Sequence, residues 1–143
     1  GREHAARGGL GIGRAAEQGH EVRALAVANA VGDIIAADGS VLAGTGAPHP
    51  VYVPPAPSEE GFPTNTALAL VAIRARLDKL QVRWLASRGS DGITTSVRPA
   101  HTRYDGDVTF AVAAPGSGPA ANLDILGHLA TRAVADAVRN AVR

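Results

Sequence analysis

Short apolar runs separated by turn residues dominate the first third of the chain. Residues 21–29 and 32–36 are rich in Val, Leu, Ile and Ala, and this pattern predicts two short strands. The sequence Ala-Asp-Gly-Ser at 37–40 is typical of a tight turn, and a short apolar stretch follows at 41–43. The pattern therefore predicts a β-hairpin in this part of the chain.

The second half of the chain alternates between strand and helix signals. A continuous apolar run at 66–73 has the length of a strand, and residues 108–113 predict another. Asp78 is suited to cap a helix that Pro99 would end, and Asn122 is suited to cap a final helix. The order strand, helix, strand, helix predicts an α/β fold.

Each predicted helix carries an apolar face that can pack on a sheet. Gly89 and Gly92 weaken the middle of the first helix, whereas the face of the final helix is mostly alanine. The 143 residues are enough for one domain, and with 45% hydrophobic but only 3% aromatic residues the core must consist of closely packed small side chains. The apolar faces comprise Leu77, Leu80, Trp84, Leu85, Ile93 and Val97 in the first helix, and Leu126, Ala130, Ala133, Ala137 and Ala141 in the final helix.

Four glycines, at positions 8, 9, 11 and 13, precede the first predicted strand. Glycine-rich loops can bind phosphates, but a dinucleotide-binding fingerprint needs a strand before the glycines and a helix after them. Here the predicted strand comes after the glycines. The order favours a bend or a close backbone contact over a phosphate site, and no cofactor is predicted.

A proline-rich segment connects the hairpin to the strand at 66–73. Six of the nine prolines lie between residues 44 and 65, where Glu59 and Glu60 also lie. Proline fixes φ and removes a backbone donor, so this density predicts an exposed loop without regular structure.

Charge and cysteine content exclude several classes of function. The 14 basic and 13 acidic residues give a net charge of +1, so neither nucleic acid nor a membrane surface is a predicted partner. The chain has no cysteine, which excludes thiolate chemistry and fits a reducing, cytoplasmic location. No apolar run approaches the length of a membrane span, and the start at Gly1 rather than Met predicts a fragment boundary.

Thr66 stands where the proline-rich loop becomes an apolar strand. Cleavage of the Asn65–Thr66 bond would leave an α-amine beside the Thr66 hydroxyl. That amine has an ordinary pKa of about 7.7–8.0, so one residue could supply both the nucleophile and its base. The alternative is structural, because β-branched residues commonly open strands.

Two carboxylates and an amide are further candidates for a site. Asp105 and Asp107 flank a glycine at the entrance to a strand, where one could accept a proton and the other could hold the first in place; a tight turn is the alternative. With His101 they resemble a loose metal-ligand set, but the other histidines lack ligand spacing and no metal is predicted. Asn29 ends a predicted strand and could donate into an oxyanion hole, or bond to nearby backbone instead.

Several ordered blocks cover nearly the whole chain. They are Arg7-Gly8-Gly9-Leu10-Gly11, Asn29-Ala30-Val31-Gly32-Asp33, Thr64-Asn65-Thr66, Arg98-Pro99-Ala100-His101-Thr102 and Asp105-Gly106-Asp107. Together they resemble the L-aminopeptidase/D-esterase (DmpA) family, which includes β-aminopeptidases and nylon-oligomer hydrolases. The nylon-oligomer hydrolases are the closer model, because this chain resembles them both in Asn-Thr at the bond that they cleave in themselves and in Asp-Gly-Asp downstream.

The resemblance implies a precursor that cleaves itself before a Ser or Thr and forms an αββα sandwich, of which this chain resembles the C-terminal part. On this chain the cut would fall between Asn65 and Thr66. Residues 1–65 would then belong to the α-subunit, with 44–65 as a processing loop, and residues 66–143 would form the β-subunit segment.

The resemblance also implies roles for individual residues. Thr66 would be the nucleophile in both self-cleavage and amide hydrolysis, Asn29 the oxyanion-hole donor, and Asp105 and Asp107 the acidic network around the nucleophile. The expected enzyme is an aminopeptidase or amidase that acts on a small peptide or amide through an acyl-enzyme, without a cofactor. The expected partners are the upstream part of the same precursor and further copies, in a homo-oligomer of processed heterodimers.

Two other functions remain open at this stage. The chain can be a truncated, inactive relative that serves as a structural or assembly subunit. It can also belong to the related ornithine acetyltransferases, in which an acyl-Thr intermediate passes its acyl group to glutamate.

Overall fold

A computed structural model of the chain describes residues 8–44 and 65–143. Residues 1–7 and most of the predicted processing loop, residues 45–64, lie outside the described residues. In chain order the elements are β1 (Gly9–Glu17), β2 (His20–Asn29), β3 (Asp33–Ile35), β4 (Val41–Ala43), β5 (Thr66–Ile73), α1 (Lys79–Ser96), β6 (Val97–Arg98), β7 (Val108–Ala113) and α2 (Leu123–Asn140).

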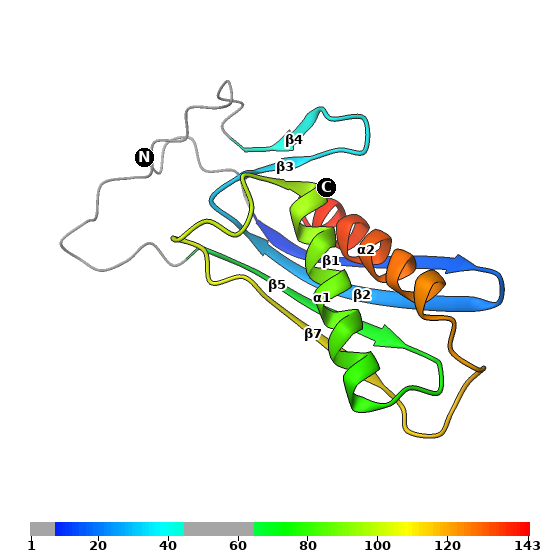
Figure 1. The fold of residues 1–143 in the computed structure, drawn as a ribbon. Coiled ribbons are helices and arrows are strands. Elements are labelled where there is room, and N and C mark those ends of the chain that lie inside the picture. The colour runs from blue at the N-terminus through cyan, green and yellow to red at the C-terminus, as the bar shows by residue number, and fades with distance from the viewer. Residues whose placement is uncertain (1–7, 45–64) are drawn as a thin grey trace.

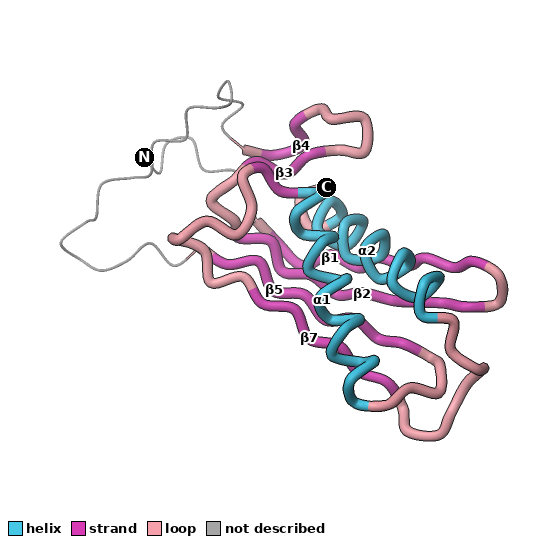
Figure 2. Tube along the Cα trace, viewed as in Figure 1, coloured by secondary structure: helices cyan, strands magenta, loops and turns pink. Residues whose placement is uncertain are grey.

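The main sheet has four strands in the order β1-β2-β5-β7. β1, β2 and β5 pair antiparallel, whereas β5 and β7 are parallel and are connected through α1 and β6. A small second sheet has the order β4-β3-β6. Both helices lie on one face of the main sheet (Figures 1 and 2), so the predicted α/β class is confirmed.

Three of the four glycines near the N-terminus, Gly9, Gly11 and Gly13, lie within β1, under α2, and Gly8 directly precedes this strand. A Cβ added to Gly11 would lie 2.0 Å from the Ala137 carbonyl oxygen, and one added to Gly13 would lie 1.9 Å from that of Ala133. The expectation of a close backbone contact is therefore confirmed. The expectation that the first strand begins only after the glycines was wrong, since β1 begins at Gly9. The glycines have no side chains, and this allows α2 to lie directly on the strand.

The start of α1 is as predicted, and its predicted apolar face is buried in part, at Leu85, Ile93 and Val97. Asp78 caps the helix in a capping box with Gln81. Leu80 and Trp84, assigned to the core from their spacing, are 75% and 42% exposed. The buried residues of α1 are the predicted Leu85 and Ile93 together with three small residues that were not assigned to this face, Gly89, Gly92 and Ser96.

The glycines of α1 allow it to approach its neighbours closely. A Cβ on Gly89 would lie 2.7 Å from Val71 Cγ2 in β5, and one on Gly92 would lie 2.5 Å from the Thr131 carbonyl oxygen in α2. The Thr131 hydroxyl also donates to the Arg88 carbonyl oxygen at 2.8 Å. Glycines that reduce helix propensity thus permit the packing that holds the two helices together.

α2 follows the prediction closely. The Asn122 side chain accepts a hydrogen bond from the Ile125 N–H at 3.2 Å and caps the helix. Its predicted face is fully buried at Leu126, Ala130, Ala133 and Ala137, and Ala141 is partly buried against the core. Neither described helix combines the length and the apolar character needed to cross a membrane.

The opposite face of the main sheet is apolar and exposed. Cross-strand neighbours continue one apolar row over all four strands, from Leu10 through Val27 and Leu68 to Val108. Leu10, Ile12 and Phe110 are between 59% and 65% exposed. We call this surface the apolar sheet face, and its exposed residues are Leu10, Ile12, Leu25, Val27, Leu68, Val108, Phe110 and Val112.

Candidate active site

β2 and β5 bring Asn29 and Thr66 together. The strands pair antiparallel, and Asn29 lies directly opposite Thr66 in the register. Residues directly opposite each other on antiparallel strands project from the same face, with Cβ atoms about 4.5–5.5 Å apart. The pair therefore lies at one end of the apolar sheet face, next to the row of Val27 and Leu68.

The peptide bond between Asn65 and Thr66 has a distinctive hydrogen-bonding environment. Thr66 Oγ1 donates to the Asn65 carbonyl oxygen at 2.7 Å, and the Gly106 backbone N–H donates to the same oxygen at 3.0 Å. A parallel bridge between Asn65 and Asp105 extends the pairing of β5 with β7 and places Gly106 there. Two donors thus polarise this carbonyl, and the Thr66 hydroxyl lies beside it.

Asp107 holds the start of β5. Its side chain is only 2% exposed. Oδ1 accepts a hydrogen bond from the Ala67 backbone N–H at 2.7 Å, so the carboxylate binds the residue that follows Thr66 rather than the Thr66 hydroxyl. Oδ2 accepts a hydrogen bond from the backbone N–H of His101 at 3.2 Å, and the His101 ring atom Nδ1 lies 2.8 Å from the same oxygen.

Asp105 connects the loop before β7 to the turn that follows β2. Its Oδ2 accepts hydrogen bonds from the Thr102 N–H at 3.0 Å and the Thr102 hydroxyl at 2.6 Å. Its Oδ1 accepts one from the Val31 N–H at 3.2 Å. Because Val31 lies two residues after Asn29, Asp105 holds the segment that carries Asn29 next to the segment that carries Thr66.

The structure therefore gathers all four predicted site residues at one end of the main sheet. This is the end where β2 ends and β5 begins (Figure 1). Sequence reasoning missed the Gly106 N–H, because the spacing of Asp105-Gly106-Asp107 by itself favoured a tight turn. It also missed the contact of His101 with Asp107, since it considered His101 beside the two aspartates only as part of a loose metal-ligand set. Within residues 8–44 and 65–143, no group of three or more His, Asp or Glu side chains is placed to hold a metal ion.

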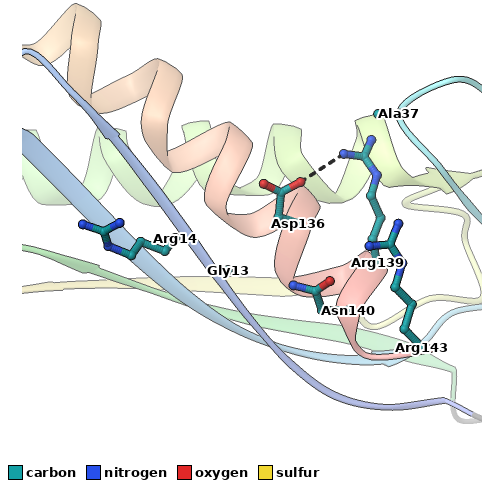
Figure 3. A pocket seen from close by; sticks show the side chains of 7 residues that line it. All are labelled: Gly13, Arg14, Ala37, Asp136, Arg139, Asn140 and Arg143. Atoms are coloured by element: carbon teal, nitrogen blue, oxygen red, sulfur yellow. Dashed lines mark hydrogen bonds and ion pairs between the residues drawn. The ribbon is translucent and has the colours of Figure 1, made fainter.

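A hollow of about 340 Å³ lies elsewhere, beside β1 and the end of α2, and contains none of the four site residues. Its lining includes three arginines, but Figure 3 shows the Arg14 side chain pointing away from Arg139 and Arg143. Arg139 is already engaged, because its Nε donates to the Ile35 carbonyl oxygen at 2.9 Å and its Nη1 lies 3.4 Å from Asp136 Oδ1. The cations do not converge on one point, so this hollow is not a built anion site.

Solved structures identify the class of fold. A β-aminopeptidase of Burkholderia sp. matches with a TM-score of 0.69 and 23% identity, over 96% of this chain and 42% of that one. The L-aminopeptidase D-Ala-esterase/amidase of Ochrobactrum anthropi, described as a variant among the Ntn hydrolase fold, matches with a TM-score of 0.55 and 20% identity, over 96% and 40%. The chain thus shares part of the fold of these two structures, which supports the predicted layered sandwich as a partial domain.

Sequence comparison identifies the family. Residues 2–143 match Peptidase family S58, and the chain belongs to that family, which confirms the resemblance found in its blocks. An uncharacterized aminopeptidase of Mycobacterium leprae is 31% identical over 136 residues, which cover 83% of this chain and 36% of that protein. One of Mycobacterium tuberculosis is 32% identical over 127 residues, which cover 78% and 37%. The chain spans little more than a third of the length of these curated relatives.

Proposed function

We propose that this chain carries the self-cleavage junction and the nucleophile of an S58 aminopeptidase or amidase. One observation carries the proposal: the Asn65 carbonyl oxygen accepts hydrogen bonds from both the Thr66 hydroxyl and the Gly106 N–H. A carbonyl held between a hydroxyl nucleophile and a fixed backbone donor is the arrangement that acyl transfer requires.

The cut follows as an N-to-O acyl shift. Thr66 Oγ attacks the Asn65 carbonyl carbon, and the Gly106 N–H stabilises the negative charge that develops on the oxygen. The C–N bond then breaks, the hydroxyl proton ends on the Thr66 nitrogen, and an ester joins Asn65 to Thr66 Oγ. Water hydrolyses the ester, which leaves the Asn65 carboxylate and a free Thr66 amine and hydroxyl.

Turnover repeats this chemistry on an external amide. The freed Thr66 amine takes the hydroxyl proton as Oγ attacks the substrate carbonyl carbon. The resulting ammonium gives this proton to the substrate nitrogen, the C–N bond breaks and the amine leaves an acyl-enzyme, which water hydrolyses. The Asn29 amide supplies a donor for the oxyanion from the strand opposite Thr66. Asp107 and Asp105 hold the two segments in place through Ala67 and Val31.

The partner that completes the enzyme is the upstream part of the same precursor. The apolar sheet face supports this, because it exposes large apolar residues on all four strands and ends at Asn29 and Thr66. Contiguous apolar surfaces of this kind mark interaction sites. A layer packed on this face would form the other wall of the substrate site, and processed heterodimers would then assemble into the homo-oligomer that the family resemblance implies.

Intact mass spectrometry of the protein at its natural length tests the proposal. The wild type should yield two fragments that part between Asn65 and Thr66, whereas Thr66→Ala should remain one chain and hydrolyse no amino-acid amide. Thr66→Ser keeps the hydroxyl and should still be cut. Thr94→Ala is the matched control, because Thr94 is an exposed threonine in α1 and its loss should leave cutting unchanged.

Three results would contradict the proposal in different ways. An uncut and inactive wild type would favour the structural-subunit alternative. A cut protein that transfers acetyl groups from acetylornithine but hydrolyses no amide would favour the acetyltransferase alternative. Cutting in Thr66→Ala would exclude Thr66 as the nucleophile.

A further inference from the structure

His101 lies between a helix residue and the buried carboxylate of the site. Its Nδ1 lies 2.8 Å from Asp107 Oδ2, and its Nε2 lies 3.3 Å from Ser90 Oγ in α1. Its backbone has φ of +53°, a left-handed conformation that non-glycine residues seldom adopt. In this conformation both the backbone N–H and Nδ1 of His101 reach the same oxygen of Asp107.

The positions of the protons follow from which groups can donate in the contacts of His101 with Asp107 and Ser90. An ionised carboxylate can only accept, so Nδ1 must carry a proton and donate it to Asp107. In neutral imidazole Nε2 is then the acceptor, and the Ser90 hydroxyl donates to it. Ser90 thus favours the tautomer in which His101 can hold Asp107.

The other oxygen of Asp107 extends this chain to the nucleophile. It accepts from the Ala67 N–H, one residue after Thr66, whose hydroxyl lies against the Asn65 carbonyl. We propose that His101 is a positioning residue, held by Ser90, which fixes the Asp107 carboxylate and so sets the direction of the Thr66 hydroxyl. This inference rests on the function proposed above.

The order Ser90, His101, Asp107 also matches a hydrolytic triad with its own serine nucleophile, but the geometry disfavours that function. The separation of 3.3 Å between Ser90 Oγ and Nε2 is long for a hydroxyl that gives up its proton. Ser90 lies well inside α1, where the backbone N–H groups are bonded along the helix and cannot form an oxyanion hole. Asp107 is also bound to the start of β5, which connects this carboxylate to Thr66.

Two substitutions at position 101 separate the side-chain hydrogen bond from the backbone. Glycine and asparagine both tolerate the left-handed conformation, but only asparagine offers an N–H close to the place of Nδ1. Full-length protein with His101→Gly should cut itself about tenfold more slowly than the wild type, near the lower end of the range expected when a hydrogen bond to a charged group is lost. His101→Asn should recover most of that rate, to within about threefold of the wild type.

Ser90→Ala and a spectroscopic measurement test the tautomer. Alanine keeps α1 intact, and without the Ser90 hydroxyl cutting should slow by about two- to tenfold, the effect of losing a neutral hydrogen bond. The ¹⁵N spectrum of the imidazole in the Thr66→Ala precursor should show the proton on Nδ1, and Ser90→Ala should reduce that population. His128→Asn, an exposed histidine of α2, is the control and should change neither cutting nor the His101 signal.

The outcomes separate this inference from the proposed function. If the wild type is cut and Thr66→Ala is not, the result supports the proposed function. Cutting at the wild-type rate in a folded His101→Gly protein would then overturn only the role of His101. Equal slowing by His101→Gly and His101→Asn, with unchanged thermal unfolding, would overturn it as well. A Thr66→Ala protein that hydrolyses a simple ester until Ser90→Ala is added would instead support the serine triad.

Discussion

Replacing Asp107 with Asn tests whether a buried carboxylate holds the start of β5. The Asp107 side chain is 2% exposed, and its oxygens accept hydrogen bonds from the Ala67 N–H at 2.7 Å and from the backbone N–H of His101. His101 Nδ1 lies 2.8 Å from Oδ2. Asparagine keeps one oxygen and presents an NH₂ group in place of the other. At least one hydrogen bond to a charged acceptor is therefore lost, because the new NH₂ group faces a donor of Ala67 or His101 where a carboxylate oxygen was.

The size of the effect follows from which donors are left without an acceptor. Hydrogen bonds to charged groups contribute about 1.5–3 kcal/mol each, which corresponds to about a 10- to 150-fold change in rate if the bond is lost in the transition state. The His101 side chain is 38% exposed, so water can take over its donors, and the amide oxygen should turn toward Ala67. We therefore expect Asp107→Asn to slow cutting at Asn65–Thr66 by about tenfold, near the lower end of this range.

The assay is the rate at which the two fragments appear after synthesis of the full-length protein, followed by intact mass spectrometry. Asp136→Asn is the control, because its carboxylate is 48% exposed in an ion pair with Arg139, and such pairs contribute about 0–1 kcal/mol. If Asp107→Asn were cut as fast as the wild type and unfolded at the same temperature, Asp107 would not hold the nucleophile segment. Equal slowing by Asp136→Asn would mean that cutting responds to general destabilisation.

Two further predictions concern stability. Gly13→Ala should lower the free energy of unfolding by about 1–3 kcal/mol in chemical denaturation, because the new Cβ would lie 1.9 Å from the backbone oxygen of Ala133. Adding Ala133→Gly should not restore the stability, since that substitution leaves the backbone oxygen in place. Hydrogen bonds from Arg14 and then Arg23 lower the pKa of Glu21 from 4.5 to about 2. Because the pKa of Glu21 is lowered in the folded state, its contribution to the free energy of unfolding is present above about pH 4.5 and is lost as the pH falls toward 2. Glu21→Gln should remove this part of the pH dependence of unfolding, and high salt should weaken it in the wild type.

Local signals predicted most of the secondary structure. The strand at 66–73 was predicted with its observed bounds, and Asp78 and Asn122 cap the two helices as expected. These features depend on a few consecutive residues, because a cap is made by a side chain and a backbone N–H three positions away. The buried face of α1 was found only in part, at Leu85 and Ile93. A helical pattern of large apolar residues gives no weight to glycines, although Gly89 and Gly92 make close contacts with β5 and α2.

The candidate site divides in the same way. By itself the sequence indicated Thr66 at the boundary of a loop and a strand, and its ordered blocks added Asn29, Asp105 and Asp107. Only the tertiary structure placed the Gly106 N–H on the Asn65 carbonyl oxygen and the carboxylate of Asp107 on the amide of Ala67, which is 40 residues away in sequence. The physical reason is that these contacts arise from the parallel pairing of β5 with β7 across the α1 connection, and the register of such a pairing is set by packing in three dimensions rather than by any local pattern.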